Sequence, residues 1–524
     1  MAVASSSKTV RRFMRKFNIT GSIIPELHYY VDLTPQLDKL MALVGEGTYF
    51  VVNRPRQFGK TTMLKFFAQR LRASGNFAPA LFSFQSFTQR PDITEPEFYN
   101  PVAKSIFTEL VSTADATAAP ANDSAVNSRH DFFAWLGKIC AQRKVVLLID
   151  EVDAIPDNVV IGFLANLREM FLERWRRPAP HAVALAGVHD IKNLQARYRD
   201  ETKSLGSASP FNIAIDYVIP PFSRENIRDY YAQHTADTGQ AFDEQVITRV
   251  HELTSGYPWL VSALAKRLVE EVVPDRTATI NIHHLDEAVQ RFLRENNTHF
   301  DSLIKHAYEP NLQPIVIDLL QGRHYPFTPF DPALNRLALY GVIRAGETNG
   351  CVIGNRIYEQ VLFASFHRVM ASQMLGGDAT AGVVDAEGRL DFRRVLDKFQ
   401  TFMKAKGAQV VRSGEFKEAT GQLLLLSYLD LLVNGKGWTF KEVQSGEGRI
   451  DVICCYKKQK EIVELKLWYG EQRYDQGLNQ LLRYLESESL DRGYLVVFDR
   501  REVAKEYTFS EHQVDEKKIF AWVV

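Results

Sequence analysis

Two sets of residues in this chain have the types and spacing that chemistry on phosphates requires. The first is Gly59-Lys60-Thr61, which follows a loop and opens an apolar-rich helical stretch, MLKFFAQRL. Backbone N–H groups and a helix N-terminus attract phosphate, a lysine adds positive charge, and a threonine hydroxyl can ligate Mg²⁺. The pattern G-x-x-x-x-G-K-[ST] calls for glycine where this chain has Arg54. The stretch therefore predicts a phosphate-binding loop with one unusual residue.

A second motif, about 90 residues further on, completes this predicted site. Asp150 and Glu151 end the apolar run 145–149, and ligands of parallel α/β sheets bind beyond the carboxyl ends of the strands. Asp150 is expected to hold Mg²⁺ through water, and Glu151 to orient an attacking water. The two motifs together predict ATP and Mg²⁺ as cofactors. Thr61 and Asp150 are the expected metal ligands, and the loop residues expected to contact nucleotide are Arg54, Pro55, Arg56, Gln57, Phe58, Gly59, Lys60, Thr61 and Thr62.

The second set of residues is Asp451, near the start of one expected strand, and Glu464-Leu465-Lys466 on the next. Side chains alternate along a strand, so Glu464 and Lys466 share a face, and a hairpin can bring Asp451 beside them. Asp451, Glu464 and the Leu465 carbonyl could then ligate Mg²⁺, while Lys466 positions water for in-line attack on a phosphodiester. Charges among apolar neighbours are costly without partners, which favours a site over solvated strand charges.

The elements that must position the first set alternate between strands and helices. Continuous apolar strands separated by helices predict a parallel sheet covered on both faces. After residue 222 the pattern predicts helices only, as far as residue 295. The expected strands are 50–52, 81–87, 145–149 and 183–186, and the expected helices are 35–44, 63–71, 96–114 and 131–142.

The second set lies within a different order of elements: helix, three strands, helix, strand. The expected helices are 391–404, 418–433 and one around 476–485, and the expected strands are 438–444, 449–456, 460–468 and 493–499. Between the two sets, helices at 314–321 and 331–340 followed by a hairpin and a helix give a winged-helix pattern, which could pack between domains or contact DNA.

The composition limits the classes of function. The 524 residues suffice for about three or four domains. Lys plus Arg equals Asp plus Glu at 63 each, so no global field attracts nucleic acid and any polyanion must meet a local patch. Four scattered cysteines fit a reducing compartment. The longest apolar run, 423–433, is too short to cross a bilayer, and no signal peptide is evident, which predicts a cytoplasmic protein that does not bind membranes.

Four stretches, NRPRQFGKTTML, LLIDEVDAI, ALAGVHDIKNL and TSGYPWL, resemble the AAA-ATPase-like family of the signal-transducing ATPase group related to archaeal ATPases. The resemblance covers roughly residues 17–295. That family commonly has arginine at the position of Arg54, which makes it a family trait. The family's Gly-x-Pro contacts nucleotide phosphates near the lid helices, which implies Gly256 and Pro258.

The resemblance to these ATPases implies further residues that could contact the nucleotide. Residues 18–32 form an irregular lead-in to the first expected helix. In ATPases with such a lead-in, aromatic residues often cover the adenine, so Tyr29 and Tyr30 are candidates, with interior packing as the alternative. A polar residue after the strand 183–186 commonly senses the γ-phosphate, so His189 or Asp190 could do so, or could only cap the strand.

The stretches GEGRIDV, IVELKLWYG, QGLNQLLRYL and GYLVVFD resemble the PD-(D/E)xK nuclease domain often fused to this ATPase family, over about residues 391–524. By that resemblance Asp451, Glu464 and Lys466 are catalytic and Gln480 is an accessory residue. A further carboxylate from the apolar helix is usual, with Glu418 as the nearest candidate and Glu415 the next.

The expected α/β architecture therefore has six parts. These are a flexible N-terminus (1–20), a P-loop ATPase core (21–222), a helical lid (223–295), a winged-helix-like domain (296–373), a linker (374–390) and a restriction-endonuclease-like α/β domain (391–524). The leading hypothesis is an ATP-hydrolysing, Mg²⁺-dependent nuclease that acts on DNA rather than RNA. Nucleotide state would gate the assembly or cleavage of a homo-oligomer, plausibly in defence against foreign DNA. The alternative is a nucleotide-switched signalling or scaffold protein whose nuclease-like domain only binds.

Overall fold

The structure is a computed structural model, which describes residues 14–88, 90, 92–111, 126–187, 213–295, 297–320, 324–346, 349–375, 382–385, 388–404, 421–422, 424–426, 428–429, 437–445, 448–457, 459–499 and 508–524. The chain divides into two compact units, each described by itself below. The first unit contains residues 1–296, 335–342 and 355–357, and the second contains 297–334, 343–354 and 358–524. The finer division into six parts remains a prediction.

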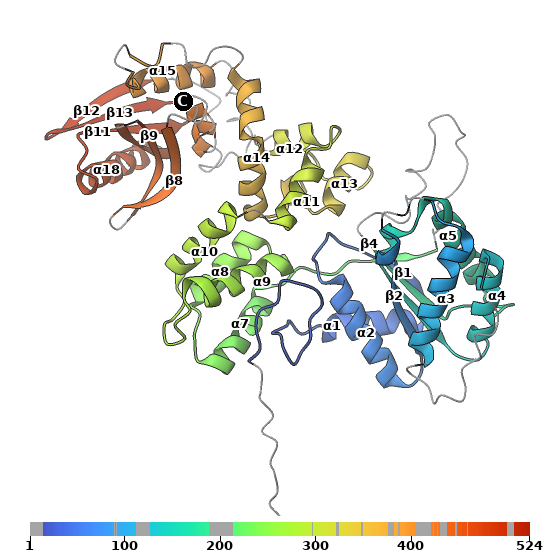
Figure 1. Ribbon diagram of the computed structural model, residues 1–524. Helices are drawn as coiled ribbons and strands as arrows, with labels where there is room; N and C mark the ends of the chain where they lie inside the picture. The colour runs from blue at the N-terminus through green and yellow to red at the C-terminus, as the bar shows by residue number, and fades with distance from the viewer. Residues whose placement is uncertain are drawn as a thin grey trace, which may run out of the picture. The chain divides into compact units, whose positions relative to one another are not determined.

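A five-stranded parallel sheet forms the centre of the first unit (Figure 1). Its strand order is β2-β3-β4-β1-β5, with every pair parallel, as the alternating strands and helices predict. The strands are β1 (Tyr49–Asn53), β2 (Ala78–Ser83), β3 (Val145–Asp150), β4 (Ala182–Gly187) and β5 (Ile215–Tyr217). Residues of β3 and β4 are buried along their whole length, so these strands form the core of the sheet.

Parallel neighbours need a crossover, which helices provide here as far as β4. α1 (Thr34–Gly45) precedes β1, α2 (Lys60–Ser74) connects β1 to β2, α3 (Glu95–Val111) and α4 (Arg129–Cys140) connect β2 to β3, and α5 (Asp157–Glu173) connects β3 to β4. In Figure 1, α3, α4 and α5 lie together on one side of the sheet, and α1 and α2 lie toward the other. Alternate residues of the strands, such as Val51, Leu147 and Leu185, join the apolar side chains of α3, α4 and α5 in one core.

The second strand differs from the expectation of 81–87. It begins earlier, at Ala78, and ends at Ser83, which pairs with Asp150 at the end of β3. Phe84 still donates its N–H to the Asp150 carbonyl at 3.1 Å, but its ψ of 6° turns the chain out of the extended conformation. Residues Gln85–Phe87 then form a 3₁₀ turn, and the Phe84 ring packs in the core against Phe98 with ring centroids 5.5 Å apart. The strand-like alternation of aromatic residues in 81–87 therefore extends beyond Ser83, where the strand itself ends.

Residues 223–295 are helical, as expected, apart from an isolated bridge between Phe242 and Ile280. The elements are α7 (Arg224–Thr238), α8 (Glu244–Thr254), α9 (Pro258–Arg267), a π-helical turn η4 (Leu268–Val272) and α10 (Ile282–Arg294). Ser223 caps α7 by accepting the N–H of Asn226, and Pro258 occupies the first turn of α9, where its missing N–H is tolerated.

Gly256 follows the residue that caps α8. The cap is Ser255, whose φ of 48° is left-handed, and Gly256 follows with a φ of 70°. A Cβ at Gly256 would lie 2.0 Å from the carbonyl oxygen of Phe222, whose N–H donates to the Gly256 carbonyl at 2.9 Å. Only glycine allows this approach of two backbones, where the β5–α7 connection meets the start of α9.

Between the two chemical motifs the chain follows the expected order of helices, hairpin and helix. The elements are α11 (Thr298–Ala307), α12 (Gln313–Leu320), α13 (Pro332–Leu339), the antiparallel strands β6 (Ile343–Ala345) and β7 (Cys351–Ile353), and α14 (Arg356–Leu375). No helix among the described residues is long and apolar enough to cross a membrane.

A six-stranded mixed sheet forms the centre of the second unit, with the order β12-β13-β11-β10-β9-β8. Its elements are α15 (Phe392–Phe402), β8 (Gly437–Ser445), β9 (Gly448–Tyr456), β10 (Gln459–Leu467), α18 (Glu471–Ser487), β11 (Arg492–Phe498), β12 (Phe509–Val514) and β13 (Lys517–Val523). The elements from α15 to β11 match expected ones, whereas β12 and β13 have no counterpart in the sequence prediction. The described residues between 421 and 429 are helical, and Glu415 and Glu418 lie outside the described residues.

Gly256→Ala should destabilise the first unit much more than a matched change in another left-handed glycine. Gly239, which caps α7 with a φ of 82°, has no atom within 4 Å of a Cβ placed on it. Gly239→Ala should therefore cost only the left-handed conformation, about 1–2 kcal/mol. Gly256→Ala adds a backbone clash and should cost about 3 kcal/mol or more. Chemical denaturation checks this, and equal losses for the two variants would contradict it.

Candidate functional site

The loop between β1 and α2 has the backbone shape of a phosphate cradle. Gln57 has a φ of 57°, and Gly59, which begins α2, has a φ of 84°. Left-handed residues in such loops turn successive N–H groups toward one concavity. No atom lies within 4 Å of the place where a Cβ of Gly59 would project, so the start of α2 faces open space. The loop therefore fits the phosphates that the sequence predicts.

Lys60 lies inside this loop. Its side chain is 7% exposed, and Nζ donates to the carbonyl oxygens of Arg54 at 2.6 Å and Pro55 at 2.9 Å. Desolvation lowers the Lys60 pKa, while the carboxylates of Asp153, Glu151 and Asp150 oppose that shift. The amine thus stands between loop carbonyls and a group of carboxylates, where an arriving phosphate would be a strong partner.

Thr61 joins the two sequence motifs. Its hydroxyl donates to Asp150 Oδ2 at 2.6 Å, and Asp150 Oδ1 accepts the N–H of Glu151 at 3.0 Å. Asp150 is buried at the carboxyl end of β3, beside the start of α2. A hydroxyl and a carboxylate on adjacent elements are oxygen donors that suit Mg²⁺, either directly or through water. The residues present therefore fit the predicted metal.

Glu151 follows Asp150 in a strained conformation. Its φ of 53° is left-handed, which is unfavourable for a residue with a side chain, and it begins the 3₁₀ turn η2 (Val152–Ala154). Desolvation and then the charge of Asp150 raise the Glu151 pKa, and Lys60 opposes them. A carboxylate with a raised pKa beside the loop can accept a proton from water.

Asp153 is not among the site residues predicted from the sequence. Its carboxylate is the foremost charge opposing the lowered pKa of Lys60, ahead of Glu151 and Asp150. It also lies against Gly187 at the end of β4, where a Cβ would be 2.8 Å from Asp153 Oδ2. The pattern Asp-Glu-x-Asp was visible in the sequence, but only the 3₁₀ turn returns the third carboxylate toward the loop.

Arg54, the residue in place of glycine, reaches out of the loop. Its Nε donates to the carbonyl of Ile219 at 2.6 Å, and its guanidinium lies 4.7 Å from the ring centroid of Phe58. Burial lowers the Arg54 pKa. Nearby, the Tyr257 hydroxyl donates to the carbonyl of Arg56. The loop is thereby attached both to the connection that precedes α7 and to the residue that precedes α9.

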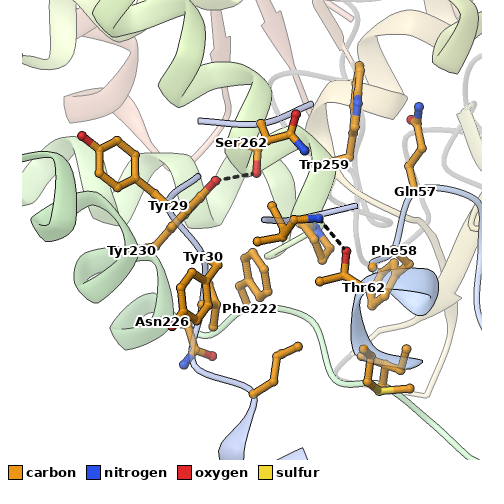
Figure 2. Close-up of a pocket in the computed structure, with 18 of the residues that line it drawn as sticks. Tyr29, Tyr30, Gln57, Phe58, Thr62, Phe222, Asn226, Tyr230, Trp259 and Ser262 are labelled. Atoms are coloured by element: carbon orange, nitrogen blue, oxygen red, sulfur yellow. Dashed lines mark hydrogen bonds between the residues drawn. The ribbon is translucent and has the colours of Figure 1, made fainter. Parts of the chain in front are cut away.

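A cavity of about 400 Å³ adjoins the loop. Figure 2 shows its walls, with hydrogen bonds joining Tyr230 to Ser262 and a backbone N–H to Thr62. Most lining residues are apolar or aromatic, which suits a flat heterocyclic base. They come from the lead-in (Asn18, Ile19, Thr20, Gly21, Ile23, Tyr29, Tyr30, Val31, Leu33), α1 (Gln36), the loop and α2 (Gln57, Phe58, Gly59, Thr62, Met63, Phe66) and residues 219–262 (Ile219, Pro220, Pro221, Phe222, Asn226, Tyr230, Pro258, Trp259, Ser262).

The lead-in is attached to both neighbouring parts of the first unit. The Ile23 N–H donates to the Thr62 hydroxyl at 3.3 Å, and the Trp259 indole N–H donates to the Ile19 carbonyl at 3.1 Å. Arg15 forms an ion pair with Asp237 of α7 at 3.0 Å. The cavity is thus closed by segments that are more than 200 residues apart in sequence.

The structure separates the two tyrosine candidates. Tyr29 is fully buried and packs against Phe17, with ring centroids 4.9 Å apart, so its ring belongs mainly to the interior. Tyr30 is partly exposed at the cavity and packs edge-on against Phe66. Tyr30 is therefore the better placed of the two for contact with a base.

Of the other residues expected to contact nucleotide, some line the cavity and others do not. Pro258 lines the cavity and Gly256 does not; Gly256 is buried against Phe222. Thr62 lines the cavity, and Asp190 and His189 lie outside the described residues. Trp259, Tyr230 and Asn226 were missed, although Trp259 directly follows Pro258 in the TSGYPWL stretch.

The second set of residues meets on β9 and β10, which pair antiparallel. Asp451 Oδ2 accepts the N–H of Leu465 at 2.8 Å. Lys466 Nζ donates to Glu464 Oε1 and, at 3.1 Å, to the Leu465 carbonyl. Glu464 is 0% exposed and Lys466 5% exposed, so this is a buried ion pair. The expected residues are therefore brought together around Leu465.

Gln480 lies on α18, which packs over this group. A Cβ on Gly477 of that helix would lie 3.0 Å from the Lys466 stem, so glycine allows the close approach. The Gln480 amide donates to the Tyr484 hydroxyl at 2.9 Å. Two carboxylates and a carbonyl suit Mg²⁺, which keeps several waters. The described residues contain no group of three or more His, Cys, Asp or Glu side chains that could hold a metal.

Comparisons with known proteins add likenesses of fold. No protein-family model and no curated protein matches the chain. A solved Walker-type ATPase of Pyrococcus abyssi is 15% identical, with a TM-score of 0.48, over 66% of this chain and 99% of that one. The RuvB Holliday junction branch migration motor of Thermotoga maritima is 12% identical, with a TM-score of 0.35, over 63% and 95%. Cdc6p of Pyrobaculum aerophilum is 13% identical, with a TM-score of 0.33, over 66% and 96%. The function is therefore argued from the geometry.

Arg54→Ala should weaken nucleotide binding about tenfold, because it removes a charged hydrogen bond and the contact with Phe58 that hold two cavity walls. The nucleotide affinity of Arg54→Lys should lie between those of the wild-type protein and Arg54→Ala, since an ammonium cannot replace the planar guanidinium. The rate of ATP hydrolysis at saturating ATP should change little. Titration with a fluorescent ATP analogue checks this, with Arg70→Ala on the surface of α2 as control. Unchanged affinity with a reduced rate would instead indicate a direct role of Arg54 at the phosphates.

The pKa shifts predict the pH limits of hydrolysis. Glu151 accepts a proton only as a carboxylate, and its pKa is raised, so the rate should fall as the pH drops through a midpoint above 4.5. Lys60 attracts phosphate only when protonated, and its pKa is lowered, so nucleotide affinity should weaken as the pH rises toward 10.5. Profiles of kcat/KM and of binding against pH check both limits. An acid midpoint at or below 4.5 would contradict the first.

Proposed function

We propose that this chain binds and hydrolyses ATP with Mg²⁺. The observation that carries the proposal is the meeting of Lys60, Thr61 and Asp150 at one end of the parallel sheet, beside an apolar cavity of about 400 Å³. A cationic loop next to an apolar cavity suits a nucleotide, because the phosphates need amides and cations while the base needs apolar walls.

Each residue in this proposal has its own task. The loop amides and Lys60 hold the β- and γ-phosphates. Thr61 and Asp150 provide oxygen ligands, and bound Mg²⁺ neutralises the charge that develops on the phosphates. Glu151, just beyond the end of β3, orients the attacking water. Its raised pKa suits it to take a proton from that water.

We further propose that the second unit is a Mg²⁺-dependent nuclease of the PD-(D/E)xK kind. The arrangement around Leu465 supports this, because its N–H bonds Asp451 and its carbonyl bonds Lys466. Asp451, Glu464 and the Leu465 carbonyl are candidate ligands for Mg²⁺, which supplies a Lewis acid at the scissile phosphate. Lys466 would position the attacking water, and Gln480 on α18 would assist.

ATP state would gate assembly or cleavage in this proposal. The loop is attached to the connection before the lid helices through Arg54 and to Tyr257 of the lid through Arg56, so a bound nucleotide has contacts through which it could reorient the lid. We propose a homo-oligomer that acts on DNA rather than RNA, in a setting such as defence against foreign DNA.

One observation favours the alternative, a nucleotide-switched scaffold whose nuclease-like unit only binds. Lys466 already donates to Glu464, and Asp451 already accepts the Leu465 N–H, so these residues satisfy one another. A purely structural group would have the same contacts.

The purified full-length protein should cut plasmid or linear DNA in the presence of Mg²⁺ and ATP. Lys466→Ala should reduce cleavage about a hundredfold or more while leaving ATP hydrolysis intact, because Lys466 is placed to position only the nuclease water. Asp451→Asn keeps an acceptor for the Leu465 N–H and provides a second variant with less disturbance of the buried pair. Lys60→Ala should abolish ATP binding and remove the dependence of cleavage on nucleotide.

The outcomes separate the candidates. Light scattering of the same sample with and without ATP reports assembly. No cleavage of any nucleic acid by the wild-type protein, with or without ATP, would sink the nuclease proposal. If ATP still changed the size of that protein, the scaffold function would be favoured.

A further inference from the structure

The edge of the parallel sheet opposite the nucleotide site carries an exposed aromatic residue among cations. Trp175, just after α5, is 84% exposed, and its neighbours Arg176 and Arg177 are also exposed. An indole with most of its surface in water is unusual, since large aromatic side chains normally bury their apolar area. In a chain with no net charge, such a local patch is where a polyanion would be attracted.

The turn that presents Trp175 is well held. The N–H groups of Arg176 and Arg177 both donate to the Glu173 carbonyl, at 2.8 and 2.9 Å. Arg174 Nη1 donates to the Gly47 carbonyl at 2.8 Å, and its guanidinium lies 4.0 Å from the ring centroid of Phe171 and 5.3 Å from that of Trp175. The indole is thus supported on one side by a cation and left open on the other.

A further cation belongs to the same edge of the sheet. Lys144 is exposed and directly precedes β3, while residues 174–181 precede β4, its parallel neighbour. His181 connects the two segments: its N–H donates to the Val145 carbonyl at 2.8 Å. Burial lowers the His181 pKa, and the charges of Lys144 and Arg174 lower it further, which places both cations near the ring.

Together, Lys144, Arg174, Trp175, Arg176 and Arg177 define what we name the Trp175 surface. Residues 174–177 contain three arginines and no carboxylate, and Lys144 adds a fourth cation, so the surface defined in this way is positively charged. Strands β1 and β3 are five and six residues long, so the surface is about 15–20 Å from the phosphate loop. It is therefore a site separate from the nucleotide cavity.

We propose that the Trp175 surface binds single-stranded nucleic acid, with an unpaired base stacked on the indole and adjacent phosphates held by Arg176, Arg177 and Lys144. Stacking on an aromatic face with cations along the backbone is how proteins hold single strands without reading sequence. A duplex is a poorer fit, because its bases are already stacked on one another. The proposal gives a contact to the nucleic acid partner of the proposed function, and this binding requires neither ATP hydrolysis nor cleavage.

The test uses the full-length protein in EDTA, so that no strand is cut, and a fluorescein-labelled oligodeoxythymidine read by anisotropy. Trp175→Ala should weaken binding about fivefold or more through the loss of one stacked base. The double variant Arg176→Gln/Arg177→Gln should lower the slope of log affinity against log salt by about 1.4, since two phosphate contacts are lost. Leu172→Ala, an exposed apolar change on α5, and Arg249→Gln, which changes a partly exposed arginine paired with Glu252 on α8, are the matched controls.

Wild-type affinity and salt slope in both Trp175-surface variants would overturn the proposal. It would also be overturned if these variants changed the sedimentation of the protein while leaving oligonucleotide binding unaltered, because the surface would then join protein chains. ATP hydrolysis and DNA cleavage, measured separately with Mg²⁺, report on the proposed function, so failure of one proposal is distinguishable from failure of the other.

Discussion

The hydrogen bond from Thr61 to Asp150 is the interaction on which the first unit's chemistry depends. It joins the first turn of α2 to the end of β3, which are about 90 residues apart in sequence. β3 and β1 are separated by β4 in the sheet, so the bond spans the edge where three parallel strands end. This edge brings Lys60, Glu151 and Asp153 close together. Because they are close, the charge of each affects the pKa values of Lys60 and Glu151.

The elements around this edge could be predicted from sequence because long apolar runs have few alternatives. Strands β1, β3 and β4 and their parallel orientation follow from such runs, whereas the order of the strands in the sheet was not predicted. Other features depend on contacts that no local pattern encodes. The strand β2 ends at Ser83, after which Phe84 turns the chain and packs its ring in the core, and Asp153 reaches Lys60 only through a 3₁₀ turn. The cavity walls were harder still to predict, since Trp259 and Ile19 meet only after the lid has folded.

In the second unit, too, some features could be predicted from local sequence patterns and others could not. Alternation along β10 places Glu464 and Lys466 on one face, and a hairpin brings Asp451 to them. Sequence did not indicate that Lys466 would be almost fully buried against Glu464. A buried pair of this kind gains little over an apolar pair, but loss of one member leaves an uncompensated charge. The presence of this pair in the core of a sheet is easier to understand for a chemical role than for stability alone, which is a reason to test the proposed nuclease function directly.

The lead-in has a consequence for how the protein is made. Its residues emerge from the ribosome before those of α7 and α9, yet Arg15 and Ile19 bond to Asp237 and Trp259, which are synthesised more than 200 residues later. Contacts with such a large separation form late, because the intervening chain must close a long loop. The parallel sheet can therefore fold around an incomplete cavity during translation. The walls of the cavity are complete only after α9 has been synthesised, so the proposed nucleotide could bind in full only to a chain that already contains α9.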